Sequence, residues 1–254
     1  MDIERRGAVA LVRMNAGKAN AIGAAFLDRM DTLLDELEQS RPRAMVLTGH
    51  GRAFSAGLDL PSLIDLPAAQ LMAFIRRFTE FMLRLFALPW PVVAAVNGHA
   101  VAGGCVLALQ ADQRLMAAGD GVIGLNEVRL GIGLPTVVVE TLRCQVPATS
   151  LFPIAGEGGL FPAAEAHRLG LVHEVVPPET LVDRAHQRDA GAGDRGLVDP
   201  RRHARLDDLE RRDLARQIEQ HAVQQVVVAA DETQRPVRRL GPGLLHRLRD
   251  AAVV

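Results

Sequence analysis

Two glycine-rich turns are the first features of the sequence that could do chemistry. The turn 102–104 separates a strand-like apolar run from an Ala/Leu-rich helical run, and the turn 54–59 follows another apolar run. Glycine lets a ligand approach the backbone closely, and the first N–H groups of a helix lack partners inside it. Each turn can therefore offer N–H groups to an anion, or to an oxygen that becomes anionic during a reaction.

A glutamate in an apolar loop is the third such feature. Two N–H donors aimed at one point would form an oxyanion hole, and loss of one donor typically slows a reaction about 10²–10³-fold. Glu127 follows the apolar segment 121–125, and the nearest downstream carboxylate is Glu140. A single glutamate in an apolar pocket tends to have a raised pKa, which suits proton transfer near neutral pH. Taken singly, each of these features is more often structural than functional.

The elements that must position these residues alternate between short apolar runs and amphipathic stretches. Apolar residues at three- and four-residue spacing predict helices over about 23–39 and 67–87. Further helices are expected from Gly103, after Pro135 and over about 162–169. Period and composition predict strands over these ranges: 3–14, 44–48, 92–96, 113–117, 121–125 and 171–176. This alternation predicts an α/β core with strands joined by crossovers.

The composition and the apolar periodicity of the chain change beyond about His186. Residues 187–205 are charged, broken by Gly and Pro, and almost without apolar periodicity, and a polar helix is expected over about 206–228. We therefore expect a core over residues 1–186 and a C-terminal helical region over residues 187–254.

Composition excludes several classes of function. The formal net charge of −1 gives no support for nucleic-acid binding. Residues 85–111 carry no charge, but prolines and glycines break this run into a strand and a helix, so we expect no membrane span. The two cysteines are isolated and no spacing predicts a metal site. The charged N-terminus is unlike a secretory signal, and we expect a reducing, cytoplasmic location.

In this order and spacing, the motifs resemble those of the crotonase (enoyl-CoA hydratase/isomerase) superfamily over roughly residues 1–186. The matching segments are 18–21, 51–60, 94–98, 102–105, 111–112, 126–127 and 130–132. The resemblance implies a spiral of ββα units with a C-terminal helical region, assembled as a homotrimer or hexamer. It also implies an acyl-CoA thioester as substrate, with no cofactor beyond the CoA that the substrate itself carries. Residues 187–254 match the family poorly.

The resemblance also assigns roles to residues. The N–H groups of Leu58 and Gly103 would form the oxyanion hole for the thioester carbonyl, with Glu127 as the acid/base. The path of CoA and its pantetheine arm would be lined by Lys18, Ala19, Ser55, Ala56, Gly57 and Asp59. For Asp59 itself, the residues favour a cap of the following helix over a role in chemistry. Asn126 either fixes Glu127 or the thioester, or only shapes the turn.

The acid/base positions discriminate among the reactions of the superfamily. Its hydratases hold a water between two glutamates, and the corresponding positions here are Val106 and Glu127. One base is enough to move a proton from C2 to C4 of a 3-enoyl-CoA, and the motifs resemble the mitochondrial-type short-chain delta isomerases most. Pro135 stands where dienoyl-CoA isomerases carry an aspartate. We therefore predict an enoyl-CoA isomerase; the alternatives are a hydratase or other thioester chemistry, or a non-catalytic CoA-binding protein.

Overall fold

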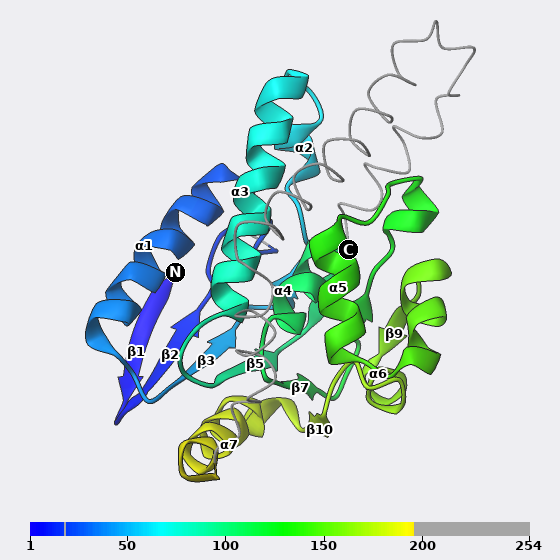
Figure 1. The fold of residues 1–254 in the computed structure, drawn as a ribbon. Helices are drawn as coiled ribbons and strands as arrows, with labels where there is room; N and C mark the ends of the chain where they lie inside the picture. The colour runs from blue at the N-terminus through cyan, green and yellow to red at the C-terminus, as the bar shows by residue number, and fades with distance from the viewer. Residues whose placement is uncertain (18, 196–254) are drawn as a thin grey trace, which may run out of the picture.

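Two β-sheets form the framework of the protein in the computed structural model, which describes residues 1–17 and 19–195 (Figure 1). In the larger sheet the strand order is β1 (Asp2–Arg6), β2 (Val9–Arg13), β3 (Ala44–Thr48), β5 (Val92–Val96), β7 (Gln113–Ala117) and β10 (Glu174–Val176). The smaller sheet contains, in order, β4 (Ala53–Ser55), β6 (His99–Val101), β8 (Val122–Gly124) and β9 (Leu160–Pro162). Within these sheets β1 and β9 pair antiparallel to their neighbours, and the other pairings are parallel.

The chain visits the two sheets alternately and then forms a helix. Strand β3 enters the large sheet, β4 the small one, and α2 (Leu60–Leu63) and α3 (Ala68–Phe86) follow. The same path leads from β5 and β6 to α4 (Gly103–Leu109), and from β7 and β8 to α5 (Thr136–Gln145). These repeated ββα units confirm the α/β core that the sequence pattern predicts and the spiral that the family resemblance implies.

The remaining helical segments flank these units. They are α1 (Ala24–Ser40), η1 (Glu127–Leu130), η2 (Ala148–Ser150), η3 (Phe152–Gly156), α6 (Ala163–Arg168), η4 (Pro178–Thr180) and α7 (Leu181–Arg195). Helices α1 and α3 contact each other, while α7 packs on the large sheet at β3 and β5 (Figure 1).

Side-chain alternation along the strands gives the large sheet two apolar faces. In β3, Met45 and Leu47 join the core that includes α1, α3 and α4, whereas Val46 faces the opposite way. Val46 belongs to a second cluster, in which Leu181 and Ala185 of α7 cover the other face of the sheet. Burial on both faces explains why β3 and β5 read as continuous apolar runs instead of alternating ones.

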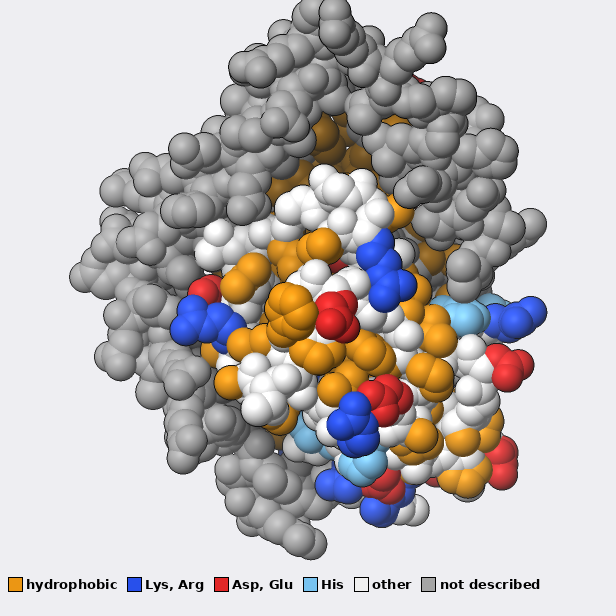
Figure 2. Space-filling view, turned by 90° about the vertical axis from the view of Figure 1, so that its right-hand side faces the viewer, with side chains coloured by type: hydrophobic (Ala, Val, Ile, Leu, Met, Phe, Trp, Pro, Cys, Tyr) orange, Lys and Arg blue, Asp and Glu red, His pale blue; other side chains and the backbone are white. Residues whose placement is uncertain are grey.

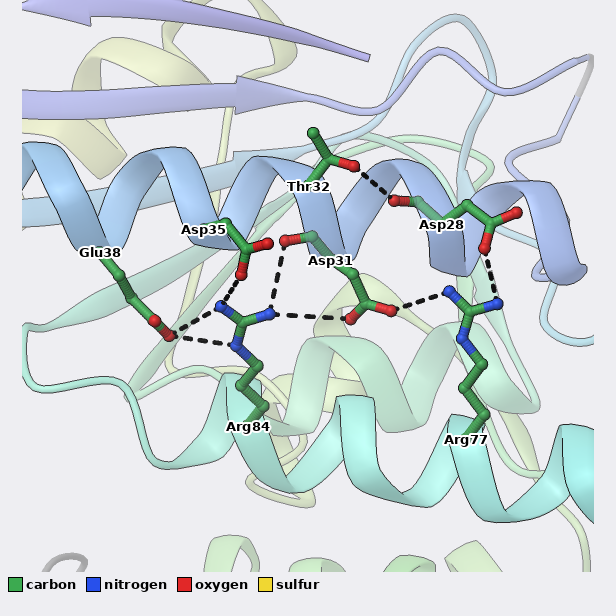
Figure 3. A network of polar contacts seen from close by, with 7 residues as sticks. All are labelled: Asp28, Asp31, Thr32, Asp35, Glu38, Arg77 and Arg84. Atoms are coloured by element: carbon green, nitrogen blue, oxygen red, sulfur yellow. Dashed lines mark hydrogen bonds and ion pairs between the residues drawn. The ribbon is translucent and has the colours of Figure 1, made fainter.

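Helices α1 and α3 are also joined by an ion-pair network on the surface (Figure 3). Arg84 of α3 lies 2.6 Å from Asp35 and 3.0 Å from Glu38 of α1, and Arg77 bridges Asp28 and Asp31. These pairs are partly exposed, so each adds little to stability beside the apolar contact beneath it. A groove of about 460 Å³ runs along the network and is lined in part by Arg76, Arg77, Glu80 and Phe81.

The structure confirms most of the predicted elements and corrects three. Residues 3–14 are two strands, β1 and β2, because Gly7 adopts a positive φ of 63° and turns the chain between them. Strands β4 and β6 lie in segments that the sequence presents as glycine-rich loops. The strand predicted over 171–176 is shortened to β10. The helix predicted over 206–228 lies outside the described residues, and the domain division at residue 186, which falls within α7, stays a prediction.

Apolar side chains are prominent on the side of the molecule that carries α5, α6 and β9 (Figure 2). The most exposed large apolar residue of the described chain is Phe152 at 68%, and Val128, Ile132 and Val139 are also exposed. Among the described residues, no helix has both the length and the apolar character needed to cross a bilayer.

Candidate functional site

Three loops that carry the predicted chemistry follow three neighbouring strands of the small sheet. Strands β4, β6 and β8 are adjacent and parallel, so their carboxyl ends lie at the same edge. Leu58 follows β4, Gly103 follows β6 and Glu127 follows β8. The fold therefore brings together residues that lie about 70 positions apart in the sequence.

The direction of the Leu58 N–H is fixed by the pairing of its neighbours. The Gly57 carbonyl accepts a hydrogen bond from Ile22 N–H at 2.7 Å, and Asp59 N–H donates to the Ile22 carbonyl at 3.1 Å. A trans peptide points its C=O and its N–H in opposite directions. Because the Gly57 carbonyl faces Ile22, the Leu58 N–H points to the other side of the loop.

Gly103 lies on that other side. A Cβ built on Gly103 would be 3.3 Å from Gly57 Cα and 3.4 Å from Leu58 N, and a Cβ on Gly57 would be 2.8 Å from Gly103 N. The preceding carbonyl, of Ala102, accepts from Val106 N–H inside α4, so the Gly103 N–H points away from the helix. Among the described residues, neither the Leu58 nor the Gly103 N–H has a hydrogen-bond acceptor. Two unpaired donors thus lie side by side, as an oxyanion hole requires.

Glu127 begins the short helix η1, with Asn126 before it. The Glu127 Oε2 and Asn126 Oδ1 atoms are buried and accept no hydrogen bond from the part of the chain that the structure describes. Burial raises the pKa of Glu127 to about 7, although a hydrogen bond from its own backbone N–H opposes the shift. A carboxyl group with this pKa can both take and return a proton near neutral pH.

Val106, at the position where the resemblance implies a second glutamate in hydratases, is an apolar core residue. Val106 is 1% exposed and packs in the main core, next to the buried Cys105. Burial raises the pKa of the Cys105 thiol, and the nearby charge of Glu127 adds to the effect, so this thiol stays protonated. Glu140 lies on α5, exposed and paired with Arg143 at 3.1 Å. Within residues 1–17 and 19–195, Glu127 is the one carboxylate with a buried oxygen that lacks a hydrogen-bond partner.

The residues predicted to line the CoA path differ in what the structure shows of them. Lys18 lies outside the described residues. The Ala19 carbonyl accepts the Ala56 N–H at 2.9 Å, which ties the two predicted segments together. Ser55 is fully buried, donates to the Asn20 carbonyl at 2.8 Å and accepts from Gly57 N–H at 3.2 Å. Its hydroxyl is therefore engaged in holding the loop.

The predicted capping role of Asp59 is only half right. Asp59 occupies the N-cap position of α2, but its side chain makes no capping hydrogen bond. Its extended loop is held by the backbone bond to Ile22 instead, so helix capping does not occupy the carboxylate. Gly57, with φ of 85°, adopts a conformation that favours glycine.

Asn20 lies in the 17–21 loop that the resemblance places along the CoA path, but it is not among the site residues named from the sequence, and the structure gives it a central position. Asn20 is 1% exposed and has a positive φ of 50°. Its amide donates to the Phe54 carbonyl at 3.0 Å, and its Oδ1 accepts the Ala16 N–H at 2.7 Å. It therefore fixes the 16–22 loop against β4. The signals of this role in the sequence are an asparagine in a turn and its place in the 18–21 segment that matches the family.

Other polar groups near the turns have structural partners or lie elsewhere. The Nδ1 atom of His99 faces the Val122 N–H at 3.4 Å, which joins β6 to β8. Arg52 is exposed. Across the described ranges, His, Cys, Asp and Glu side chains do not gather in threes that could hold a metal ion. The groove along α1 and α3 is lined by none of the predicted site residues.

Comparison with known proteins identifies the family of the chain. A family model for enoyl-CoA hydratase/isomerase matches residues 4–196. Human mitochondrial enoyl-CoA delta isomerase 1 is 34% identical over 180 residues, 70% of this chain and 60% of that protein. A short-chain-enoyl-CoA hydratase from Clostridium acetobutylicum is 34% identical over 188 residues, 73% of this chain and 72% of that protein.

Solved structures give the same result. The crystal structure of human mitochondrial delta3-delta2-enoyl-CoA isomerase superposes with a TM-score of 0.73 at 28% identity, covering 91% of this chain and 98% of that chain. The apo structure of an enoyl-CoA isomerase from Mycobacterium tuberculosis superposes equally well, with a TM-score of 0.73 and 28% identity over 89% of this chain and 97% of that chain.

The sequence matches are shorter than the proteins they match: the chain spans 60–65% of the length of the human and rat isomerases. Relatives of similar identity are named both isomerases and hydratases. The family model nevertheless covers most of the chain, and the solved relatives share its two-sheet ββα architecture. The chain belongs to the enoyl-CoA hydratase/isomerase, or crotonase, family.

Proposed function

We propose that the protein is an enoyl-CoA isomerase that converts a 3-enoyl-CoA into the 2-enoyl-CoA. The observation that carries this proposal is the carboxylate of Glu127, whose Oε2 atom is buried without a partner, on the loop after β8, next to the strand that leads to Gly103. The N–H groups of Leu58 and Gly103 lie side by side and unpaired at the same edge of the small sheet. The similarity to delta isomerases supports the substrate class.

The reaction needs only these groups. Glu127 in its carboxylate form takes a proton from C2 of the substrate, and the electron pair moves onto the thioester oxygen to give a dienolate. The N–H groups of Leu58 and Gly103 donate hydrogen bonds to that oxygen and stabilise its charge. The electrons then return, C4 takes the proton from Glu127, and the double bond lies between C2 and C3. The proton that leaves C2 is the one that C4 receives, and no water is consumed.

The apolar side chain of Val106 is the reason to favour isomerisation over hydration. Hydration needs a water to be activated and its second proton delivered, and two carboxylates suit this task. Here Val106 is buried in the core and Glu140 faces solvent, so Glu127 would act alone. A lone base suits a proton that moves along one substrate molecule.

The proposal is tested by incubating the full-length protein separately with 3-enoyl-CoA and with 2-enoyl-CoA. We expect isomer formation from the 3-enoyl substrate, with kcat reduced by about 10³-fold or more in Glu127→Gln, because no other base replaces the carboxylate. Glu140→Gln is the matched control and should keep wild-type kcat. Since the carboxylate form is the base, kcat/KM should rise with pH through about 7.

The other outcomes identify the competing functions. Conversion of 2-enoyl-CoA into the 3-hydroxy product, with no isomer formed, would make the protein a hydratase. CoA-thioester binding without turnover of either substrate would make it a binding protein.

A further inference from the structure

Ala102, the residue before Gly103, has a backbone conformation that side chains rarely adopt. Its φ of 51° and ψ of −123° differ from those of Arg41, whose φ of 43° and ψ of 65° are ordinary left-handed values at the end of α1. The φ and ψ angles of Ala102 are typical of glycine and strained for alanine. Such strain persists only where the surrounding structure holds it.

Three contacts hold Ala102, and each leads to a different part of the site. Its N–H donates to the Gly124 carbonyl at 2.9 Å, which belongs to the strand before the Glu127 loop. Its carbonyl accepts the Val106 N–H at 3.1 Å in α4. Its methyl group lies against Gly57, since a Cβ built on Gly57 would be 3.1 Å from it. The base loop, the Gly103 donor and the Leu58 loop thus meet at one residue.

The Gly124 end of this arrangement cannot move freely. Gly124 has a φ of 157°, and a Cβ there would lie 2.0 Å from the Gly159 carbonyl oxygen. It pairs with Val101 of β6 on one side and with Leu160 of β9 on the other. A change in the Ala102 backbone therefore cannot be absorbed by a shift of β8.

The ψ angle of Ala102 also sets where the Gly103 N–H points, because it rotates the peptide plane that contains this N–H. An ordinary helical ψ near −42° would turn that plane by roughly 80°. The donor would then leave the position beside Leu58 N that the present geometry gives it.

We infer that Ala102 is a positioning residue, which holds the Leu58 and Gly103 donors in a fixed relation to Glu127 through its strained backbone and its methyl contact with Gly57. The inference rests on the proposed use of these groups in enoyl-CoA chemistry. Ala102 acts through its neighbours and takes no proton itself.

The test compares three variants of the full chain. Ala102→Gly removes the methyl contact and frees the backbone, so we expect Tm to stay equal or rise while kcat falls about tenfold or more and KM changes less. Ala102→Ser keeps the Cβ and should retain kcat within about threefold of wild type. Arg41→Gly relieves a positive φ far from the site, and it should leave kcat unchanged.

A spectroscopic measurement separates positioning from folding. Acetoacetyl-CoA is the probe, because polarisation of its thioester carbonyl by the two donors favours the enolate, which has its own near-ultraviolet band. At saturation, Ala102→Gly should show a weaker enolate band than wild type, and Ala102→Ser a band close to wild type.

Wild-type kcat and enolate band in Ala102→Gly would overturn the inference, as would a fall in its Tm, since either result would show that no strain serves the site. The proposed function can fail separately. If the wild type bound acetoacetyl-CoA but did not isomerise 3-enoyl-CoA, the isomerase proposal would fall, and the enolate bands would still decide the role of Ala102.

Discussion

Glu127 carries both the chemistry of the site and a cost in stability. Its folded-state pKa of about 7 lies above the ordinary value of 4.5, because burial disfavours the charged form. Between these two pH values the folded protein binds more protons than the unfolded chain, so the free energy of unfolding falls as pH rises. Below pH 4.5 both states hold the proton, so the free energy of unfolding is not lowered. Above pH 7 both states have lost the proton, and the free energy of unfolding is lowered by the full amount.

Replacing Glu127 by glutamine should therefore stabilise the folded protein while removing activity. The neutral amide avoids the charge that burial penalises, so at pH 8.5 we expect Glu127→Gln to raise the free energy of unfolding by about 2–3 kcal/mol. The gain should shrink towards zero at pH 4.5. Urea unfolding at the two pH values measures it, with Glu140→Gln as the exposed control. Equal gains at both pH values would contradict the raised pKa.

At the scale of elements, three strands of the small sheet decide the geometry of the site. Strands β4, β6 and β8 are each three residues long, and each leads into a loop at the same edge of the sheet. The close approach of the first two loops depends on glycine at position 57, where a Cβ would meet both Gly103 N and the Val101 carbonyl at 2.8 Å.

Gly57→Ala should disrupt this approach, and Gly51→Ala in the same loop region is its matched control. Both glycines have a positive φ, 85° and 63°, so both substitutions carry the backbone strain of about 1–2 kcal/mol. A Cβ at position 51 meets nothing within 4 Å, whereas one at 57 forces the two donor loops apart. We expect Gly57→Ala to reduce kcat about 10²-fold or more and Gly51→Ala to keep it.

Steady-state kinetics and thermal unfolding of the two variants separate the effects. We expect Gly57→Ala to lose more Tm than Gly51→Ala, because of the added backbone clash, and to lose far more kcat when both are assayed well below their Tm values. Equal kcat in the two variants would show that the donors do not need the present spacing.

The long elements could be predicted from the sequence, but the short ones could not. Helix α3 is predicted from the spacing of Phe74, Phe78 and Phe81, which places them on one face, and β3 is predicted from an unbroken apolar run. Strand β4, by contrast, consists of Ala53, Phe54 and Ser55 inside a glycine-rich stretch, and only its pairing with β6 makes it a strand. Periodicity cannot reveal a three-residue element whose stability comes from tertiary neighbours.

Some features of the candidate site could likewise be predicted from the sequence, and others could not. The positions of Leu58, Gly103 and Glu127 follow from motif order, and the structure places their loops at one edge. Three details depend on where the 16–22 loop and β8 pack, which local sequence does not specify. They are the hydrogen-bonded hydroxyl of Ser55, the Asp59 side chain that makes no capping bond, and the strained backbone of Ala102. Assembly as a homotrimer or hexamer stays a prediction.

At the scale of the whole molecule, the buried Arg114 joins segments that would otherwise separate. It lies on β7 and is 0% exposed. Its guanidinium donates to the Leu171 carbonyl at 2.7 Å, to Gln145 Oε1 at 2.9 Å and to the Ala111 carbonyl at 3.1 Å. These bonds tie the large sheet to the end of α5 and to the segment before β10.

Arg114→Met should therefore destabilise the whole fold. Methionine fills much of the space but leaves the Leu171, Gln145 and Ala111 acceptors buried without this donor, and we expect a loss of about 3–5 kcal/mol in the free energy of unfolding. Arg143→Met is the matched control: its side chain is 62% exposed and pairs with Glu140 on the surface, so the loss should be about 0.5 kcal/mol or less. The midpoints of urea unfolding at pH 7 give both values. If the two variants unfolded at the same urea concentration, the buried arginine would not be what holds α5 and β10 to the sheet, and apolar packing alone would have to account for that contact.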